Sequence, residues 1–179
     1  MNSYAVFLRG INVGGINIKM AELKDALASA GFTGVKTLLA SGNVVLASPD
    51  TPSAVKEQVE KCLRETFGYD AWVVVLTAQR VAELVAACPY PEDDKATHTY
   101  ITLSSDTSRL DELDAAGAAL EGSEQKRLGP EALAWLAPVG GTLDSPFSKI
   151  SAKAKFKSST TTRNLRTLIK VRDAAAALA

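Results

Sequence analysis

Residues 7–19 read FLRGINVGGINIK, and the expected fold builds outward from this stretch. It begins at the end of a β-prone run and leads into an apolar pattern with helical spacing, so it predicts a strand, a loop and a helix. Three glycines let the loop backbone adopt positive φ and approach a ligand closely. The polar side chains supply hydrogen-bond donors suited to an anion. We therefore expect a binding loop whose candidate ligand residues are Arg9, Gly10, Asn12, Gly14, Gly15, Asn17 and Lys19.

The segments around this loop predict four strands and two helices. The expected strands cover residues 3–9, 35–40, 43–47 and 72–76, and the expected helices cover 20–30 and 52–67. Ser41-Gly42, between the second and third strands, is a short-hairpin signal. Thr51 and Pro52 stand at the cap and first-turn positions of the second helix. The resulting order, β-α-β-β-α-β, is that of a split βαβ, or ferredoxin-like, domain.

The connections of such a domain bring the loop and the hairpin together. With right-handed crossovers, the first and second strands run in the same direction and the third lies between them, antiparallel to both. Residues 10–18 and the hairpin then lie at the same end of the sheet. Ser41, Gly42 and Asn43 accordingly join the candidate ligand residues, with Asn43 beside Arg9.

The second half of the chain repeats part of this order. A helix after Thr77, a strand over 97–103, a helix over 110–120 and a hairpin around Gly129-Pro130 are expected, followed by helices instead of a closing strand. We expect an α+β fold of two packed ferredoxin-like halves, the second incomplete and followed by C-terminal helices. The halves would cover residues 1–77 and 78–179, either as two domains or as one compact unit.

A second candidate anion site lies near the C-terminus. Residues 158–164 read SSTTTRN and precede an apolar pattern at Leu165, Leu168 and Ile169 that predicts a helix. An exposed helix N-terminus offers free N–H groups, and an arginine adds a bidentate donor. On this reading the ligand residues include Thr162, Arg163 and Asn164. The alternative is that these polar residues only cap the helix.

Charge is distributed unevenly along a chain whose formal net charge is zero. Residues 149–179 carry eight Lys+Arg and one Asp+Glu, whereas residues 1–148 carry 12 and 19. The basic segment either neutralises the acidic part of the fold or binds an anionic ligand or nucleic acid.

The remaining composition excludes several classes of protein. Cys62 and Cys88 are isolated and fall in apolar helical patterns, which favours reduced thiols over a disulfide or a zinc site. No apolar run approaches the length of a membrane span, and the run at 4–8 is too short for a signal peptide. We expect a cytoplasmic protein without a metal or a cofactor.

The candidate residues do not identify a reaction. Gly10-x-x-x-Gly14-Gly15 is followed by Ile16, so neither the P-loop spacing nor the dinucleotide-binding spacing is met. His98, the single histidine, lies on an expected strand, and Ser41 has no histidine within sequence reach. The residues therefore predict a binding role and leave catalysis open.

Four motifs stand along the chain, in the order Arg9–Gly15, Met20–Leu23, Ser41–Val44 and Thr161–Asn164. Together they resemble an uncharacterised bacterial family, the domain of unknown function DUF1697. The resemblance implies a two-part α+β fold of ferredoxin-like pieces and supplies no established activity.

Two functional hypotheses follow. The first is a site for a small anionic or phosphate-containing ligand at the end of the first sheet. Acylphosphatase offers a fold-level analogy, because it is similar in placing an arginine-bearing loop on a ferredoxin-like sheet with an asparagine nearby. The second is a nucleic-acid-binding module that uses the basic C-terminal segment, and the absence of aromatic residues from 43–47 argues against base stacking on that strand.

Overall fold

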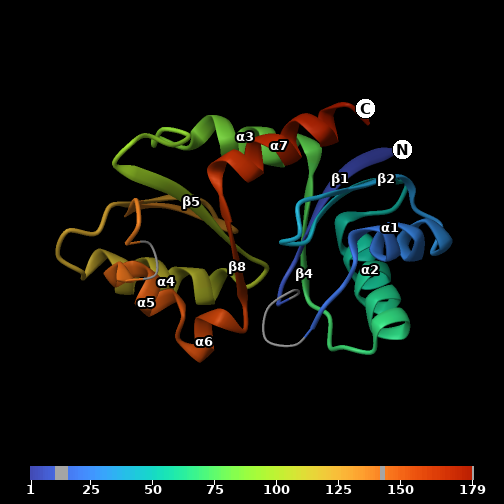
Figure 1. Cartoon of the computed structure of the whole chain (residues 1–179), viewed down its shortest axis with the longest axis horizontal. Coiled ribbons are helices and arrows are strands. Elements are labelled where there is room, and N and C mark those ends of the chain that lie inside the picture. The colour runs from blue at the N-terminus through green and yellow to red at the C-terminus, as the bar shows by residue number, and fades with distance from the viewer. Residues whose placement is uncertain (11–15, 142–143, 179) are drawn as a thin grey trace. The chain divides into compact units, whose positions relative to one another are not determined.

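The computed structural model describes residues 1–10, 16–141 and 144–178. Within these ranges the chain has an α+β fold with two four-stranded antiparallel sheets and seven helices (Figure 1). It divides into two compact units, Met1–Ala82 together with Lys170–Ala179, and Glu83–Ile169. The expected division after residue 77 placed residues 170–179 in the second half, whereas in the structure Lys170–Ala179 groups with the first unit.

The first unit is built on a sheet with strand order β2-β3-β1-β4. Strand β1 pairs antiparallel with both β3 and β4, and β3 lies between β1 and β2 as the connection rules predicted. The elements in chain order are β1 (Asn2–Leu8), α1 (Met20–Ser29), β2 (Thr33–Leu38), β3 (Asn43–Ser48), α2 (Pro52–Phe67) and β4 (Val73–Thr77).

Local signals set both ends of α2. The Thr51 hydroxyl accepts a hydrogen bond from the Ala54 N–H over 3.3 Å, and Pro52 begins α2. Gly68, with φ of 67°, ends the helix in the left-handed conformation that glycine adopts without a Cβ penalty. The predicted cap, first-turn proline and glycine stop are all confirmed.

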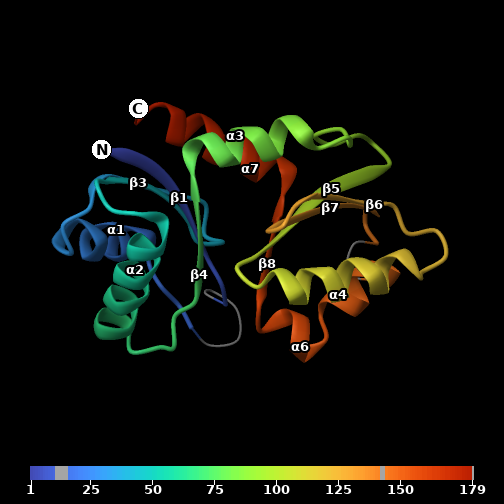
Figure 2. The ribbon, with the colours of Figure 1, turned by 180° about the vertical axis from the view of Figure 1, so that it is seen from behind.

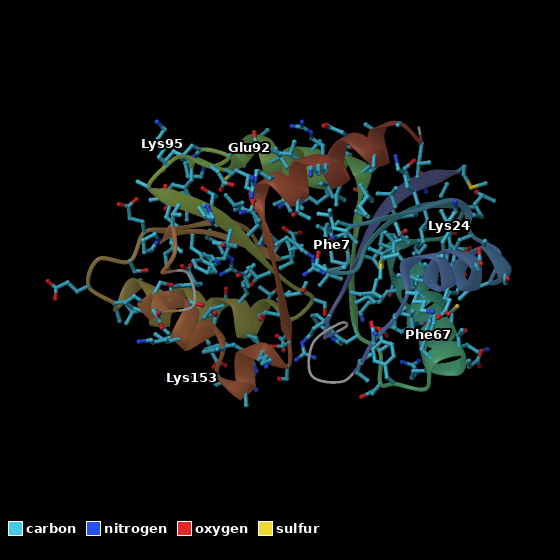
Figure 3. All side chains as sticks on the ribbon, viewed as in Figure 1. Phe7, Lys24, Phe67, Glu92, Lys95 and Lys153 are labelled. Atoms are coloured by element: carbon cyan, nitrogen blue, oxygen red, sulfur yellow. The ribbon has the colours of Figure 1, made fainter. Side chains whose placement is uncertain are left out.

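Helices α1 and α2 cover one face of the first sheet (Figures 1 and 2). Leu23 and Leu27 of α1 and Val55, Val59 and Leu63 of α2 are fully buried there. The opposite face of the sheet is buried as well. Alternate residues of its strands, including Ala5, Val45 and the Phe7 labelled in Figure 3, are fully buried.

The second unit repeats the strand order of the first. Its sheet has the order β6-β7-β5-β8. The last strand of this unit, β8, therefore lies beside its first strand, β5, as β4 lies beside β1 in the first unit. Helices α4, α5 and α6 contribute Leu110, Phe147 and Phe156 to a core on one face of this sheet. The elements are β5 (Thr97–Ser104), α4 (Thr107–Ala118), β6 (Gln125–Gly129), β7 (Ala132–Pro138), α5 (Pro146–Ser151), α6 (Ala154–Lys157) and β8 (Thr160–Asn164).

Strand β8 corrects the expectation that the second half lacks a closing strand. Its residues are polar, but their side chains form hydrogen bonds within the second unit. The Thr160 hydroxyl donates to the Phe156 carbonyl oxygen over 2.9 Å, and the hydroxyls of Thr162 and Thr102 lie 2.9 Å apart. The Trp135 indole N–H also donates to Thr102 Oγ1, over 3.0 Å. Hydrogen-bonded threonines thus replace the apolar alternation that usually marks a buried strand.

The two boundaries between the units fall within two further helices. Helix α3 (Ala78–Ala87) follows β4 directly, and the Thr77 hydroxyl accepts from the Arg80 N–H over 3.1 Å, as expected for its cap. Helix α7 (Leu165–Ala176) follows β8. No helix in the described part of the chain is long and apolar enough to cross a membrane.

Candidate functional site

The candidate site of the first unit lies at the end of its sheet where β1 finishes. The Leu8 N–H donates to the Gly42 carbonyl oxygen over 2.8 Å, and Phe7 is the register partner of Asn43. On the other side, the Arg9 N–H donates to the Trp72 carbonyl oxygen over 3.2 Å. The strand connections therefore bring Arg9 and the hairpin to one end of the sheet, as expected from the sequence.

Arg9 is half-buried at this position. Desolvation by burial lowers the pKa of its guanidinium below the ordinary value, and the group stays protonated at neutral pH. The effective dielectric constant is lower at a partly buried position than in bulk water. A half-buried guanidinium therefore attracts an anion more strongly than a fully solvated one does. Arg9 thus combines a fixed backbone position with a partly desolvated positive charge.

The hairpin is longer than the sequence suggested. Strand β2 ends at Leu38 and not at residue 40, so the loop is Leu39–Gly42 instead of Ser41-Gly42 alone. The buried Asn43 explains the difference, because its Nδ2 donates to the Leu38 carbonyl oxygen and to Ser41 Oγ, each over 2.9 Å. These bonds close the loop from inside and leave Leu39, Ala40 and Ser41 exposed.

The structure describes only some of the other candidate residues of the loop, and those it describes are exposed. Gly10 is exposed with φ of 72°, a conformation that a side chain rarely adopts. Asn17 and Lys19 are exposed on either side of Ile18, which is buried, and Lys19 directly precedes α1. Asn12, Gly14 and Gly15 lie outside the described residues.

The second predicted anion site has a different structure from the one expected. Thr162, Arg163 and Asn164 belong to strand β8 instead of an exposed helix N-terminus. Arg163 is only 6% exposed, and its Nη1 donates to Thr161 Oγ1 over 2.6 Å and to the Thr162 carbonyl oxygen over 3.0 Å. Burial lowers the pKa of Arg163 to about 10. Asn164 Oδ1 accepts from the Arg166 N–H over 2.8 Å, so the alternative of helix capping is confirmed for Asn164.

Sequence reasoning missed a cluster at the start of β4, at the same end of the sheet as Arg9. The Lys56 ammonium lies 5.5 Å from the centroid of the Trp72 ring and forms an ion pair with Glu60. Glu60 Oε1 also accepts from the Val73 N–H over 3.2 Å. The sequence places Lys56 and Glu60 on one face of α2, but nothing in their spacing indicates that this face meets Trp72.

The basic C-terminal segment is exposed on α5 and α6. Lys149, Lys155 and Lys157 are exposed, as is Lys153, which stands between the two helices (Figure 3). Lys155 Nζ lies 3.2 Å from Glu112 Oε2, so part of this charge is paired within the second unit.

The described residues contain no cluster of three or more His, Cys, Asp or Glu that could hold a metal ion. A cavity of about 480 Å³ lies at the opposite end of the first sheet, where β1 begins and β4 ends; its lining includes Met1, Tyr4, Asp50 and Gln79. No candidate residue from the sequence lines it.

The fold and the site define an α+β protein of two four-stranded sheets, with Arg9 and the Leu39–Gly42 hairpin loop at one end of the first sheet. The chain belongs to the DUF1697 family, described as a protein of unknown function, whose model matches residues 1–133. The chain is also similar to a solved structure described as the conserved bacterial protein SP0830 from Streptococcus pneumoniae.

That similarity has a TM-score of 0.81 at 22% sequence identity, and it covers 97% of this chain and 98% of the other. At this identity it shows the fold alone. The comparison with curated proteins finds no match.

Proposed function

We propose that this protein binds a small anionic, phosphate-containing ligand at the end of its first sheet. The observation that supports the proposal is that Arg9 and the hairpin lie at the same end of the sheet, where the Leu8 N–H donates to the Gly42 carbonyl oxygen. This places a half-buried guanidinium at the same end of the sheet as an exposed hydroxyl, that of Ser41. Such a pair suits a phosphate group, which takes bidentate hydrogen bonds from arginine.

The individual residues would have separate roles. Arg9 would supply the main charge, and the exposed Asn17 and Lys19 would add donors before α1. Both Nδ2 hydrogen bonds of Asn43 are made within the hairpin, so it would position Ser41 instead of contacting the ligand. Asn12, Gly14 and Gly15 remain proposed ligand residues because of the sequence alone.

Both units support a ferredoxin-like assignment. Within each unit the elements follow a β-α-β-β-α-β order, with two short helices in the second crossover of the second unit, and the strand orders correspond. The analogy with acylphosphatase rests on this assignment. If a reaction takes place, it would proceed by positioning and charge stabilisation of a phosphoryl group rather than through a covalent nucleophile.

Nucleic-acid binding by the basic segment is the alternative, and it has less support. Four exposed lysines on and between α5 and α6 would contact phosphates without reading sequence. However, Glu112 of α4 pairs with both Lys155 and Arg109, which favours neutralisation within the fold. The burial of Arg163 likewise weakens the proposal of an anion site at Thr162, Arg163 and Asn164.

A cytoplasmic location is part of the proposal. It is supported by the character of Cys62, a buried free thiol whose Sγ lies 3.5 Å from the Ala26 carbonyl oxygen, as is typical of a cysteine that packs in a core.

Titration with inorganic phosphate, followed by the melting temperature, tests the proposed function. A ligand that binds only the folded state stabilises it by about 2.7 kcal/mol at 100 times its Kd. Arg9→Ala should weaken phosphate affinity by about 10- to 100-fold, the loss typical of a charge-assisted hydrogen-bond pair, and Arg9→Lys should weaken it less. Potassium chloride of equal ionic strength separates binding from screening.

The matched control is Arg64→Ala, which removes an exposed arginine from α2 of the same unit. It should leave the phosphate-induced shift unchanged. Equal shifts in wild type and Arg9→Ala would overturn the proposal, as would unfolding of both Arg9 variants. A shift given by a short oligonucleotide, and not by phosphate, would favour the basic segment instead.

A further inference from the structure

Leu39 has two features that are unfavourable on their own. It is the one described residue other than glycine with a positive φ, at 60°, and its side chain is 48% exposed. A left-handed conformation costs a residue with a Cβ roughly 1–2 kcal/mol relative to glycine. The exposed leucine also forgoes much of the stabilisation that burial of an apolar side chain provides.

The surrounding hairpin imposes this conformation. Gly42, with φ of 83°, donates its N–H to the Leu39 carbonyl oxygen over 3.4 Å, and Asn43 holds the Leu38 carbonyl oxygen over 2.9 Å. The Gly42 carbonyl oxygen in turn accepts from Leu8. The backbone on both sides of Leu39 is thus tied to β1 and β3, and its side chain is presented to solvent from a fixed turn.

Backbone strain that the surrounding structure maintains is concentrated at binding and catalytic sites. Leu39 lies two residues from Ser41, in the loop whose end is bonded to the residue before Arg9. The exposed apolar side chain of Leu39 therefore belongs to the same hairpin as the proposed phosphate site, and inorganic phosphate has no apolar group that could contact it.

We propose that Leu39 is a specificity-determining residue that contacts an apolar group attached to the phosphate. The site then takes organic phosphates in preference to inorganic phosphate. This inference rests on the proposed function, because it assigns the ligand class of the same site.

Calorimetric titrations with inorganic phosphate and phenyl phosphate, at a pH where both are dianions, test the inference. Wild type should bind phenyl phosphate about tenfold more tightly, the gain expected when roughly 50 Å² of apolar surface leaves water. Leu39→Gly and Leu39→Asn suit a positive φ and should abolish this preference while changing phosphate affinity less than about twofold. Leu39→Met, which keeps an apolar side chain, should retain the preference.

Each outcome separates the inference from the proposed function. If phosphate binds through Arg9 and the preference survives in Leu39→Gly, or is absent in wild type, the inference is overturned and the proposed function stands. If Leu39→Gly weakens both probes equally, Leu39 serves only the structure of the loop and the inference is also overturned. If wild type binds neither probe, both proposals are wrong.

Discussion

Gly117, near the C-terminal end of α4, shows how a single missing side chain sets the packing of the second unit. A Cβ built at this position would lie 1.9 Å from Gln125 Oε1 and 2.7 Å from Phe147 Cε2. Gln125 is held in place because its Nε2 donates to both the carbonyl oxygen and Oδ1 of Asp114, each over 2.7 Å. The glycine is therefore required for close packing and not for an unusual φ.

Gly117→Ala tests this packing, because helix propensity and steric overlap predict opposite changes in the free energy of unfolding. Helix propensity alone would raise the free energy of unfolding by about 1 kcal/mol. Overpacking against Gln125 and Phe147 costs about 1–3 kcal/mol and is joined by the loss of the Asp114 hydrogen bonds. We expect a net loss of about 1–2 kcal/mol in urea unfolding.

Ala115→Gly is the matched control for this substitution. Ala115 is exposed on the same helix, so its replacement should cost about 1 kcal/mol through propensity alone. If Gly117→Ala stabilises the protein by the amount that Ala115→Gly destabilises it, the steric argument is wrong.

At the residue scale, the sequence predicted positions better than roles. Arg9 was predicted beside the hairpin because strand connections fix the end of a sheet at which a residue lies. The buried role of Asn43 could not be predicted, since it depends on a loop two residues longer than the Ser41-Gly42 signal implied. Arg163 is a similar case: hydroxyls in 158–164 indicate a cap, and only tertiary pairing with β5 reveals a buried strand.

At the element scale, the N-terminus of α4 shows a helix cap that is linked to pH. The Asp106 carboxylate accepts from the Ser108 hydroxyl over 2.7 Å and from the N–H groups of Ser108 and Arg109 over 3.0 and 3.2 Å. These bonds, above all the one from the Ser108 hydroxyl, hold the pKa of Asp106 below its ordinary value.

The sign of the resulting pH dependence follows from this lowered pKa. The carboxylate contributes stability above its unfolded-state pKa, and the contribution is lost as pH falls through the lower folded-state pKa. Asp106→Asn keeps an acceptor for the cap but does not titrate. We expect wild type to be more stable than Asp106→Asn at neutral pH and the difference to shrink on acidification. Urea unfolding of both proteins at several pH values measures it, and a constant difference would contradict the linkage.

Several element boundaries were predictable from a local signal, although the Ser41-Gly42 signal placed the end of β2 two residues too late. Thr51, Pro52 and Gly68 fixed α2, and Gly129-Pro130 marked the β6–β7 hairpin. Strand β8 was not predicted, because a strand is identified from the alternation of apolar and polar residues, and its hydrogen-bonded threonines do not show this alternation. The bounds of the short helices α5 and α6 were not predicted, because the sequence indicated only that helices follow the second hairpin.

At the scale of the whole molecule, the C-terminal segment returns to the unit in which the chain began. Lys170–Ala179 groups with Met1–Ala82, and Val171 and Ala175 are fully buried. Leu178 fits against the backbone of β2, because a Cβ at Gly34 would lie 3.0 Å from Leu178 Cδ2. The sequence could not predict that Lys170–Ala179 groups with the first unit. An apolar stripe on a helix indicates that one face is buried, but it does not indicate which element covers that face.

A chain that ends at Ile169 should therefore be less stable than the full chain. Loss of the buried Val171 side chain alone removes about 1.5–3 kcal/mol, and Leu178 adds to this. Urea unfolding of the shortened and full chains, monitored by circular dichroism, measures the difference. Ala176→Ser, at an exposed position of α7, is the control and should change stability by less than about 0.5 kcal/mol. Equal stability of both chains would show that the segment is dispensable.

The inward amide of Asn43 has a practical consequence for altering this protein. The turn is held by the Asn43 amide, which donates to the Leu38 carbonyl oxygen and to Ser41 Oγ, and by the backbone hydrogen bonds of Gly42, whereas Leu39 and Ala40 are exposed. Position 40 is therefore the place at which the exposed surface of the turn can be varied, whereas a replacement at position 39 must also suit its positive φ.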